Sequence, residues 1–274
     1  MKERKYSERQ APGSIQHRLK DDMKPKSLLP ALFIIGLGIL YGIANRKRAS
    51  RPRTAERTPP TQGQEIPNVI SKTDLAMRRY TMYFLLPLWI VPGLLDYVWH
   101  RRTKIESTSG LQESVLHSLM LAEVGIPLFA GLLLEINAGV IAVMMGGFLL
   151  HEATAVWDVA YTVKRRLILP KEQHTHSFLE VLPFCGLSFV ICMHWEQFLA
   201  LAGQGKEQPS FRIRLKRPTL PAEYLTSMLA SIVSFLVFPY GEELWRCWRA
   251  RIRGEVGRDT PECVRALFSN QENQ

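Results

Sequence analysis

The sequence predicts an all-α fold: a polytopic transmembrane helix bundle of about six spans with a four-to-five-helix core. The main observation is that all 35 Lys and Arg residues of the 274-residue chain fall outside six apolar blocks. A helix crossing a hydrocarbon core of about 30 Å needs roughly 20 mostly apolar residues, and several blocks are that long. The mean hydropathy of −0.05 therefore averages apolar spans with basic flanks and does not indicate a soluble domain. The blocks are residues 27–44, 80–99, 114–134, 136–161, 177–202 and 224–241.

The segments of the chain differ in composition. Residues 1–26 are polar and basic with few apolar anchors, so a disordered tail is expected. Residues 27–44 are expected to form a first transmembrane or interfacial helix of marginal length. The Pro- and Arg-containing residues 45–75 are predicted to be a flexible linker. Residues 76–253 are then the helical membrane core, and residues 254–274 a C-terminal tail.

The basic residues also orient the bundle. With six spans, the side that holds both termini carries 21 Lys and Arg, against 14 on the opposite side. Because cytoplasmic loops are enriched in these residues, both termini are expected in the cytoplasm. The first apolar block begins only at Ser27, so no cleaved signal peptide is expected. Basic residues that flank spans indicate the lipid bilayer, and not a nucleic acid, as the partner.

Ionisable residues are concentrated near the ends of the spans. Six of the seven histidines lie between the second and fifth spans, accompanied by acidic residues. Such groups are costly at membrane depth unless they pair, line water or bind a metal. Four pairs each share a helix face, and because the helices alternate in direction, all four are predicted on the same, cytoplasmic side. The pairs are Asp96 with His100, Glu113 with His117, His151 with Asp158, and His176 with Glu180.

Carboxylates and imidazoles on the inward faces of a helix bundle are typical of sites for two iron or manganese ions. The cofactor expected is therefore di-iron, or another divalent metal such as Mn or Zn. The soluble di-iron spacing is Glu-x-x-His, whereas this chain has Glu-x-x-x-His at Glu113 and His117. Glu106 and Glu123 are the candidates for proton delivery. The predicted metal ligands are His100, Glu113, His117, His151, Asp158, His174, His176 and Glu180.

Other polar residues have simpler interpretations. His194 is expected near the opposite face in a packing role, and Glu135 at a solvated helix end. Glu152 and Glu196 lie off the shared faces and are expected to form salt bridges or support the ligands. The four cysteines predict no disulfide framework and no CxxC metal site. For the central set, the alternative to metal or proton transfer is hydrogen bonding between helices.

Four motifs resemble those of a family of uncharacterised bacterial multispan membrane proteins, over roughly Asp96 to Arg249. That family sometimes carries a diguanylate cyclase label, but the chain has no Gly-Gly-Asp-Glu-Phe signature, so the resemblance implies no activity. It implies the fold and, as the expected location, the bacterial cytoplasmic (inner) membrane. The chain is also similar to membrane fatty-acid hydroxylases and desaturases in gathering histidines at the cytoplasmic ends of spans, and it lacks their paired His-His boxes. The motifs are Asp96–Gly110, Glu113–His117, His151–Asp158 and Glu172–Glu180.

These observations predict an integral-membrane metalloenzyme, a di-iron oxidase or hydroxylase that acts on a lipid or quinone-like substrate. One alternative is a zinc-dependent membrane hydrolase, in which a carboxylate activates water. A second is a proton- or ion-coupled transporter or channel, although neither an inverted repeat nor a continuous polar route is evident. A third is a b-type haem held between histidine pairs.

Overall fold

The computed structural model describes residues 72–269, and within that range the chain is helical without a β-strand. The all-α, multi-pass prediction is confirmed, because five helical segments are long and apolar enough to cross a membrane. The predicted tail, the first apolar block and most of the linker lie outside the described residues. The five segments are Lys72–Thr103, Leu111–Leu133, Ala138–Thr162, Pro170–Met193 and Ala222–Ile252.

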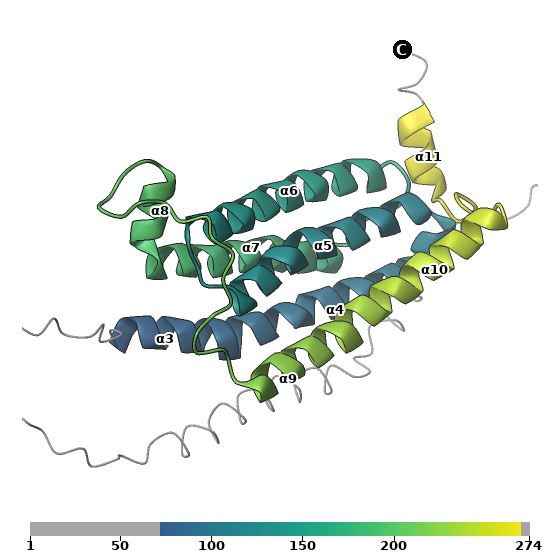
Figure 1. The fold of residues 1–274 in the computed structure, drawn as a ribbon. Helices are drawn as coiled ribbons and strands as arrows, with labels where there is room; N and C mark the ends of the chain where they lie inside the picture. The colour runs from purple at the N-terminus through teal and green to yellow at the C-terminus, as the bar shows by residue number, and fades with distance from the viewer. Residues whose placement is uncertain (1–71, 270–274) are drawn as a thin grey trace, which may run out of the picture.

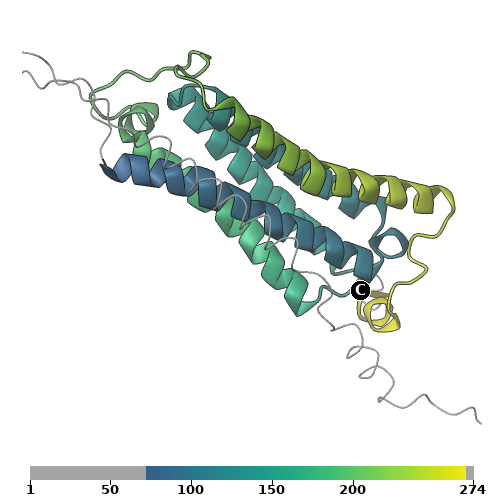
Figure 2. The same cartoon turned by 90° about the horizontal axis from the view of Figure 1, so that it is seen from below.

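The first and last of these segments are composite helices. α3 (Lys72–Tyr80) continues through a π-helical turn (Thr81–Leu85) into α4 (Leu86–Thr103). Likewise α9 (Ala222–Ile232) passes through a π-helical turn (Val233–Val237) into α10 (Phe238–Ile252). These two long rods lie side by side in both views of the bundle (Figures 1 and 2).

α10 does not end where the sixth apolar block ends. Its sequence becomes charged after Gly241, yet the helix continues to Ile252, and Glu243 is fully buried against the neighbouring helices. The helix therefore extends beyond the apolar block that ends at Gly241. A carboxylate that lies outside the apolar block is buried inside the bundle.

α5 (Leu111–Leu133) and α6 (Ala138–Thr162) are the antiparallel pair expected from the short connection between them. Asn137 caps α6, because its side-chain oxygen accepts a hydrogen bond from the Val140 amide at 3.1 Å. Within the pair, a Cβ added at Gly147 would lie 2.4 Å from Pro127 Cγ and 2.7 Å from the Glu123 carbonyl oxygen. The absence of a side chain at Gly147 thus sets how closely the two backbones approach.

The bundle is completed by α7 (Pro170–Met193), the short α8 (Trp195–Leu201) and α11 (Glu262–Ser269), which falls within the predicted C-terminal tail. Residues 202–221 form an extended connection across one end of the bundle (Figure 1). This connection is fixed to the start of the α5–α6 loop, since the Lys216 amide donates to the Leu133 carbonyl and the Glu135 amide to the Arg214 carbonyl, each at 2.9 Å.

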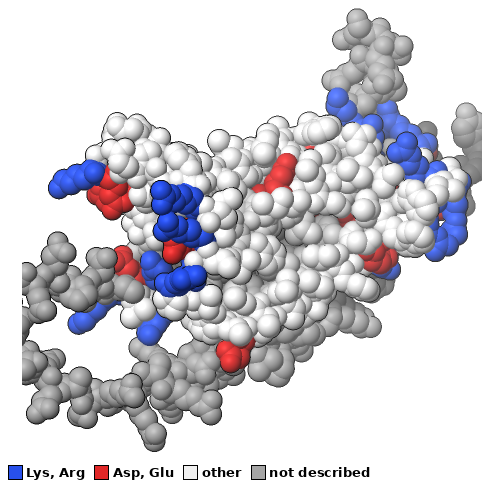
Figure 3. Space-filling model, in the orientation of Figure 1, with Lys and Arg blue, Asp and Glu red and all other residues white. Residues whose placement is uncertain are grey.

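Charge and apolar exposure are arranged as a membrane requires. On the face in Figure 3, Lys and Arg gather at the two ends, and the surface between them is almost free of them. Large apolar side chains on the spans are exposed, which lipid would cover. They include Ile126, Leu149, Leu150, Val156 and Phe238, each at least 60% exposed.

We predict that Gly147→Ala destabilises the protein by about 1–3 kcal/mol, because the added methyl group meets backbone that cannot move away without separating α5 from α6. Gly146→Ala is the matched control, since a Cβ there meets no atom within 4 Å. Denaturant unfolding of both variants in the same detergent measures the difference. Equal stability of the two variants would contradict the close packing.

Candidate metal centre

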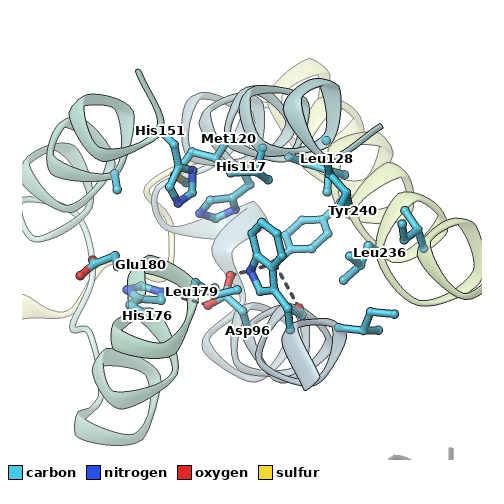
Figure 4. Close-up of a pocket in the computed structure, with 18 of the residues that line it drawn as sticks. Asp96, His117, Met120, Leu128, His151, His176, Leu179, Glu180, Leu236 and Tyr240 are labelled. Carbon is cyan, nitrogen blue, oxygen red and sulfur yellow. Dashed lines mark hydrogen bonds and ion pairs between the residues drawn. The ribbon is translucent and has the colours of Figure 1, made fainter. Parts of the chain in front are cut away.

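Buried imidazoles and carboxylates from five helices meet at one end of the bundle. α4 and α6 bring their C-terminal parts to this end, α5 and α7 bring their first turns, and α10 contributes its middle. The antiparallel order of α4 to α7 is the reason that segments distant in sequence meet here. The groups are Asp96, His100, Glu113, His117, Asp158, Glu172, His176 and Glu243. Figure 4 shows part of this set, with Asp96, His117 and His176 facing a common space.

The centre is organised by two parallel imidazoles on one carboxylate. The rings of His100 and His117 stack with their centroids 4.3 Å apart and their planes inclined by only 7°. Glu243 spans both rings: its Oε2 lies 2.9 Å from Nδ1 of His100, and its Oε1 lies 3.0 Å from Nδ1 of His117. Two N–H donors on one carboxylate fix the orientation of both rings and leave each Nε2 directed elsewhere. At this spacing no haem fits between the two rings.

The Nε2 atom of His100 faces one group of donors. It lies 3.3 Å from Asp96 Oδ1 and 3.7 Å from Glu172 Oε1, and it has no hydrogen-bond partner among the described residues. His176 joins the group through its Nε2, 2.9 Å from Asp96 Oδ1. The other oxygen of Asp96 accepts a hydrogen bond from the Tyr240 hydroxyl at 3.0 Å.

The Nε2 atom of His117 faces a second group. It lies 3.5 Å from Asp158 Oδ2 and 3.9 Å from Glu113 Oε1. Asp158 Oδ1 is buried without a hydrogen-bond partner in the described part of the chain. Each group keeps one ligand atom per residue within 4.8 Å of the others, so each could hold a metal ion.

Arg166 connects the two groups from the loop between α6 and α7. Its Nε donates to both oxygens of Glu113 at 3.1 Å, and its Nη2 hydrogen-bonds Glu113 and Glu172. Burial lowers the pKa of a guanidinium, but the charges of Glu113 and Glu172 outweigh burial and hold the pKa of Arg166 above its ordinary value. Arg166 therefore remains a permanent cation beside an acidic centre.

Five of the eight ligands predicted from the sequence belong to these groups, and three do not. His151 is buried close by, with neither ring nitrogen hydrogen-bonded among the described residues, and its ring faces His117 (Figure 4). Glu180 is half-buried, and its carboxylate points away from the centre in the same view. His174 is exposed and packs edge-on against Phe178, with ring centroids 5.2 Å apart.

The two candidates for proton delivery lie apart from the ligand groups. Glu106 lies in the loop between α4 and α5 and is ion-paired with Arg246 of α10. Glu123 lies deeper in the membrane, where its Oε1 accepts a hydrogen bond from Thr154 at 2.8 Å. Glu123 is six residues beyond His117 on α5, or about 9 Å along the helix axis.

Sequence reasoning missed Glu243, Arg166 and Glu172 as members of the centre. Glu243 follows the last apolar block, and Arg166 is one of three consecutive basic residues that were interpreted as membrane anchors. Their positions in the sequence could have indicated them. Glu243 and Arg166 each lie within about two helical turns of the end of a span, on the side where the histidines gather. No periodicity distinguishes Arg166 from Lys164 and Arg165, which are not fully buried.

No protein-family model, no curated protein and no solved structure matches the chain. The resemblance to bacterial multispan membrane proteins stays a prediction. The site is therefore interpreted from its own geometry and chemistry.

We predict that Arg166→Gln lowers the free energy of unfolding by about 3–5 kcal/mol, because it leaves Glu113 and Glu172 buried without their cation. Lys164→Gln, at an exposed position in the same loop, is expected to change stability by less than about 0.5 kcal/mol. Denaturant unfolding in detergent compares them. An Arg166→Gln variant as stable as Lys164→Gln would show that the carboxylates do not depend on the guanidinium.

Proposed function

We propose that this chain is an integral-membrane metalloenzyme that holds two metal ions, most simply iron, and oxidises or hydroxylates a lipid or quinone-like substrate. The observation that carries the proposal is the shared carboxylate. Glu243 accepts from Nδ1 of both His100 and His117 and leaves their Nε2 atoms available to two separate acidic groups. A carboxylate that holds the far nitrogen of a ligating imidazole is the usual support of a histidine metal ligand.

The spacing of the donors supports this assignment. Two ligands on opposite sides of one metal, each bonded at roughly 2.1 Å, stand about 4.2 Å apart. The donors within each group lie within 4.8 Å of one another, so small side-chain movements suffice to close a coordination shell. The first group offers two imidazoles and two carboxylates, and the second offers one imidazole and two carboxylates.

The charge of the centre supports two ions as well. Asp96, Glu113, Asp158, Glu172 and Glu243 are five buried carboxylates, and Arg166 is the one guanidinium among them. With neutral imidazoles, four negative charges remain, which two divalent cations balance. An uncompensated excess of this size would be expensive in a region that excludes water.

The donor types favour iron or manganese over zinc. Hard carboxylate oxygens outnumber imidazole nitrogens in the combined set, and no cysteine belongs to it. Structural zinc sites usually use four ligands rich in sulfur or imidazole. A pair of irons at such a site can activate oxygen for oxidation of a C–H or hydroquinone group.

The protein would supply orientation, proton handling and exclusion of water. Glu243 fixes the two imidazoles, and Arg166 keeps Glu113 and Glu172 ionised and in place. The Tyr240 hydroxyl is positioned at Asp96 and borders the apolar cavity next to the centre, where it can hold or transfer a proton. That cavity shields the reacting part of a substrate from bulk water.

We expect the full-length protein, purified from membranes, to contain about two equivalents of iron per chain by elemental mass spectrometry. His117→Ala and His176→Ala are expected to lose most of that metal, because each removes a donor from one group. His174→Ala is the matched control on the same turn of α7 and is expected to retain it. Wild-type protein without stoichiometric metal would overturn the proposal, and zinc alone would favour a hydrolase.

Glu243→Gln tests the bridging carboxylate separately. An amide keeps the size of the side chain but can accept from only one of the two imidazoles, so metal affinity is expected to fall about 10- to 100-fold. Competition with a chelator measures the affinity of the purified variant. Unchanged affinity would show that Glu243 does not position the ligands.

A proton- or ion-coupled transporter is the second candidate, favoured by one observation. His151 and Glu123, which each retain polar atoms without a hydrogen-bond partner in the described residues, line cavities that extend from the centre into the bundle. Proton flux by metal-free protein in liposomes, abolished by His117→Ala, would support transport. Stoichiometric iron without flux would support the enzyme.

A further inference from the structure

We propose that two adjoining cavities in the bundle form one binding site for a long-chain carboxylate, with its head at Arg78, Lys216 and Arg217 and its hydrocarbon chain directed toward the metal centre. The proposed binding depends only on the two cavities and the charged side chains that line them. Its role as a substrate site rests on the proposed function.

The inner cavity adjoins the centre and is mostly apolar. It has a volume of about 120 Å³, and Asp96, His117 and His176 border it on one side (Figure 4). Most of the remaining wall is hydrocarbon. The apolar wall includes Ile90, Leu121, Val124, Leu128, Met228 and Leu236. A wall of this kind selects an alkyl chain and disfavours a polar group beside the centre.

The outer cavity is larger and extends to the opposite end of the bundle. Its volume is about 560 Å³, within the usual range of about 300–1,000 Å³ for sites that hold small molecules. Its middle is apolar, with Leu132, Phe148 and Leu187 in the wall. The end near the extended connection carries the cations.

The two cavities share a wall, so one molecule can occupy both. Leu86, Trp89, Val124 and Leu128 border each of them. A chain that passes these four side chains would leave the outer cavity and enter the inner one. Both cavities are enclosed by the same helices, α4, α5, α6 and α7, with α9 and α10 closing the inner one.

The far end of the outer cavity is suited to an anion. Three basic side chains border it: Arg78, Lys216 and Arg217. The carboxylate of Glu135 lies in the wall at the same end. The Nε of Arg78 is buried without a hydrogen-bond partner among the described residues. Burial and the charge of Arg78 lower the pKa of Lys216 to about 8, so these two cations lie close enough to act on one another.

The length of the site indicates a long chain. Arg78 and Asp96 lie on one continuous helix, 18 residues apart, which corresponds to about 27 Å along the axis. A short acid held at the cations would stop well before the centre. Glu123 lies in the wall between the two ends with Thr154 as its donor, so the path passes one polar pair on the way.

The experiment measures binding of radiolabelled palmitate to full-length protein in nanodiscs, with methyl palmitate as the neutral comparison. The double variant Arg78→Gln, Lys216→Gln is expected to bind palmitate at least about tenfold more weakly, because charge-assisted hydrogen bonds to the head are lost. Lys206→Gln, exposed on the same connection, is the control and is expected to bind normally. Methyl palmitate that binds as tightly as palmitate would overturn the anionic head.

A second pair of variants tests the chain. Gly125 borders the inner cavity, and a Cβ there meets no atom within 4 Å, so Gly125→Leu fills the space without a backbone clash. We expect it to weaken palmitate binding at least tenfold and to leave binding of octanoate unchanged. Gly146→Leu, equally unobstructed but outside both cavities, is the control. Palmitate binding that Gly125→Leu leaves unchanged would overturn the path to the centre.

Metal content, measured on the same samples, separates this proposal from the preceding one. Palmitate bound by metal-free protein at the predicted residues would support the binding site while the metalloenzyme proposal fails. Stoichiometric metal in protein that binds no palmitate would overturn the binding site and leave the metalloenzyme proposal standing.

Discussion

The contact between Glu243 and the two stacked imidazoles is the constraint on which the rest of the centre depends. Because one carboxylate holds Nδ1 of both His100 and His117, neither ring can turn without breaking a buried hydrogen bond. Their free Nε2 atoms then define where the two acidic groups must lie. The helices α4, α5 and α10 are thus joined at this end by polar contacts, in surroundings where unpaired polar atoms are costly.

The same reasoning explains why the centre is so extensively connected. A carboxylate in an apolar bundle needs a cation or several donors, and here Glu113 and Glu172 share Arg166, while Asp96 has His176 and Tyr240. With neutral imidazoles, protein groups do not balance the remaining excess of carboxylates. The apolar cavities on the membrane side of this centre give it access to hydrocarbon while its ligands come from the end of the bundle.

The spacing of residues along the helices predicts much of the centre, and the predicted ligands that lie outside it show where this reasoning stops. A separation of four residues places Asp96 with His100 and Glu113 with His117 on single helix faces, and these pairs do converge. The same spacing also selects Glu180, which points away, because a shared face does not say which neighbour that face meets. His174 lies two residues before His176 on α7, and a helix turns about 200° over two residues. His174 therefore lies on the far side of the helix from His176 and is exposed.

By itself, the sequence determined that the chain is an all-α membrane protein, with a long apolar helix at each of the five predicted blocks that the structure describes, because segregation of charge from apolar residues is a local property. It also determined that imidazoles and carboxylates gather at one end, since helix direction alternates from span to span. Only the tertiary structure decided that Glu243 and Arg166 complete that centre. Their positions depend on how α10 and the α6–α7 loop pack against helices distant in sequence, and no local pattern encodes such contacts.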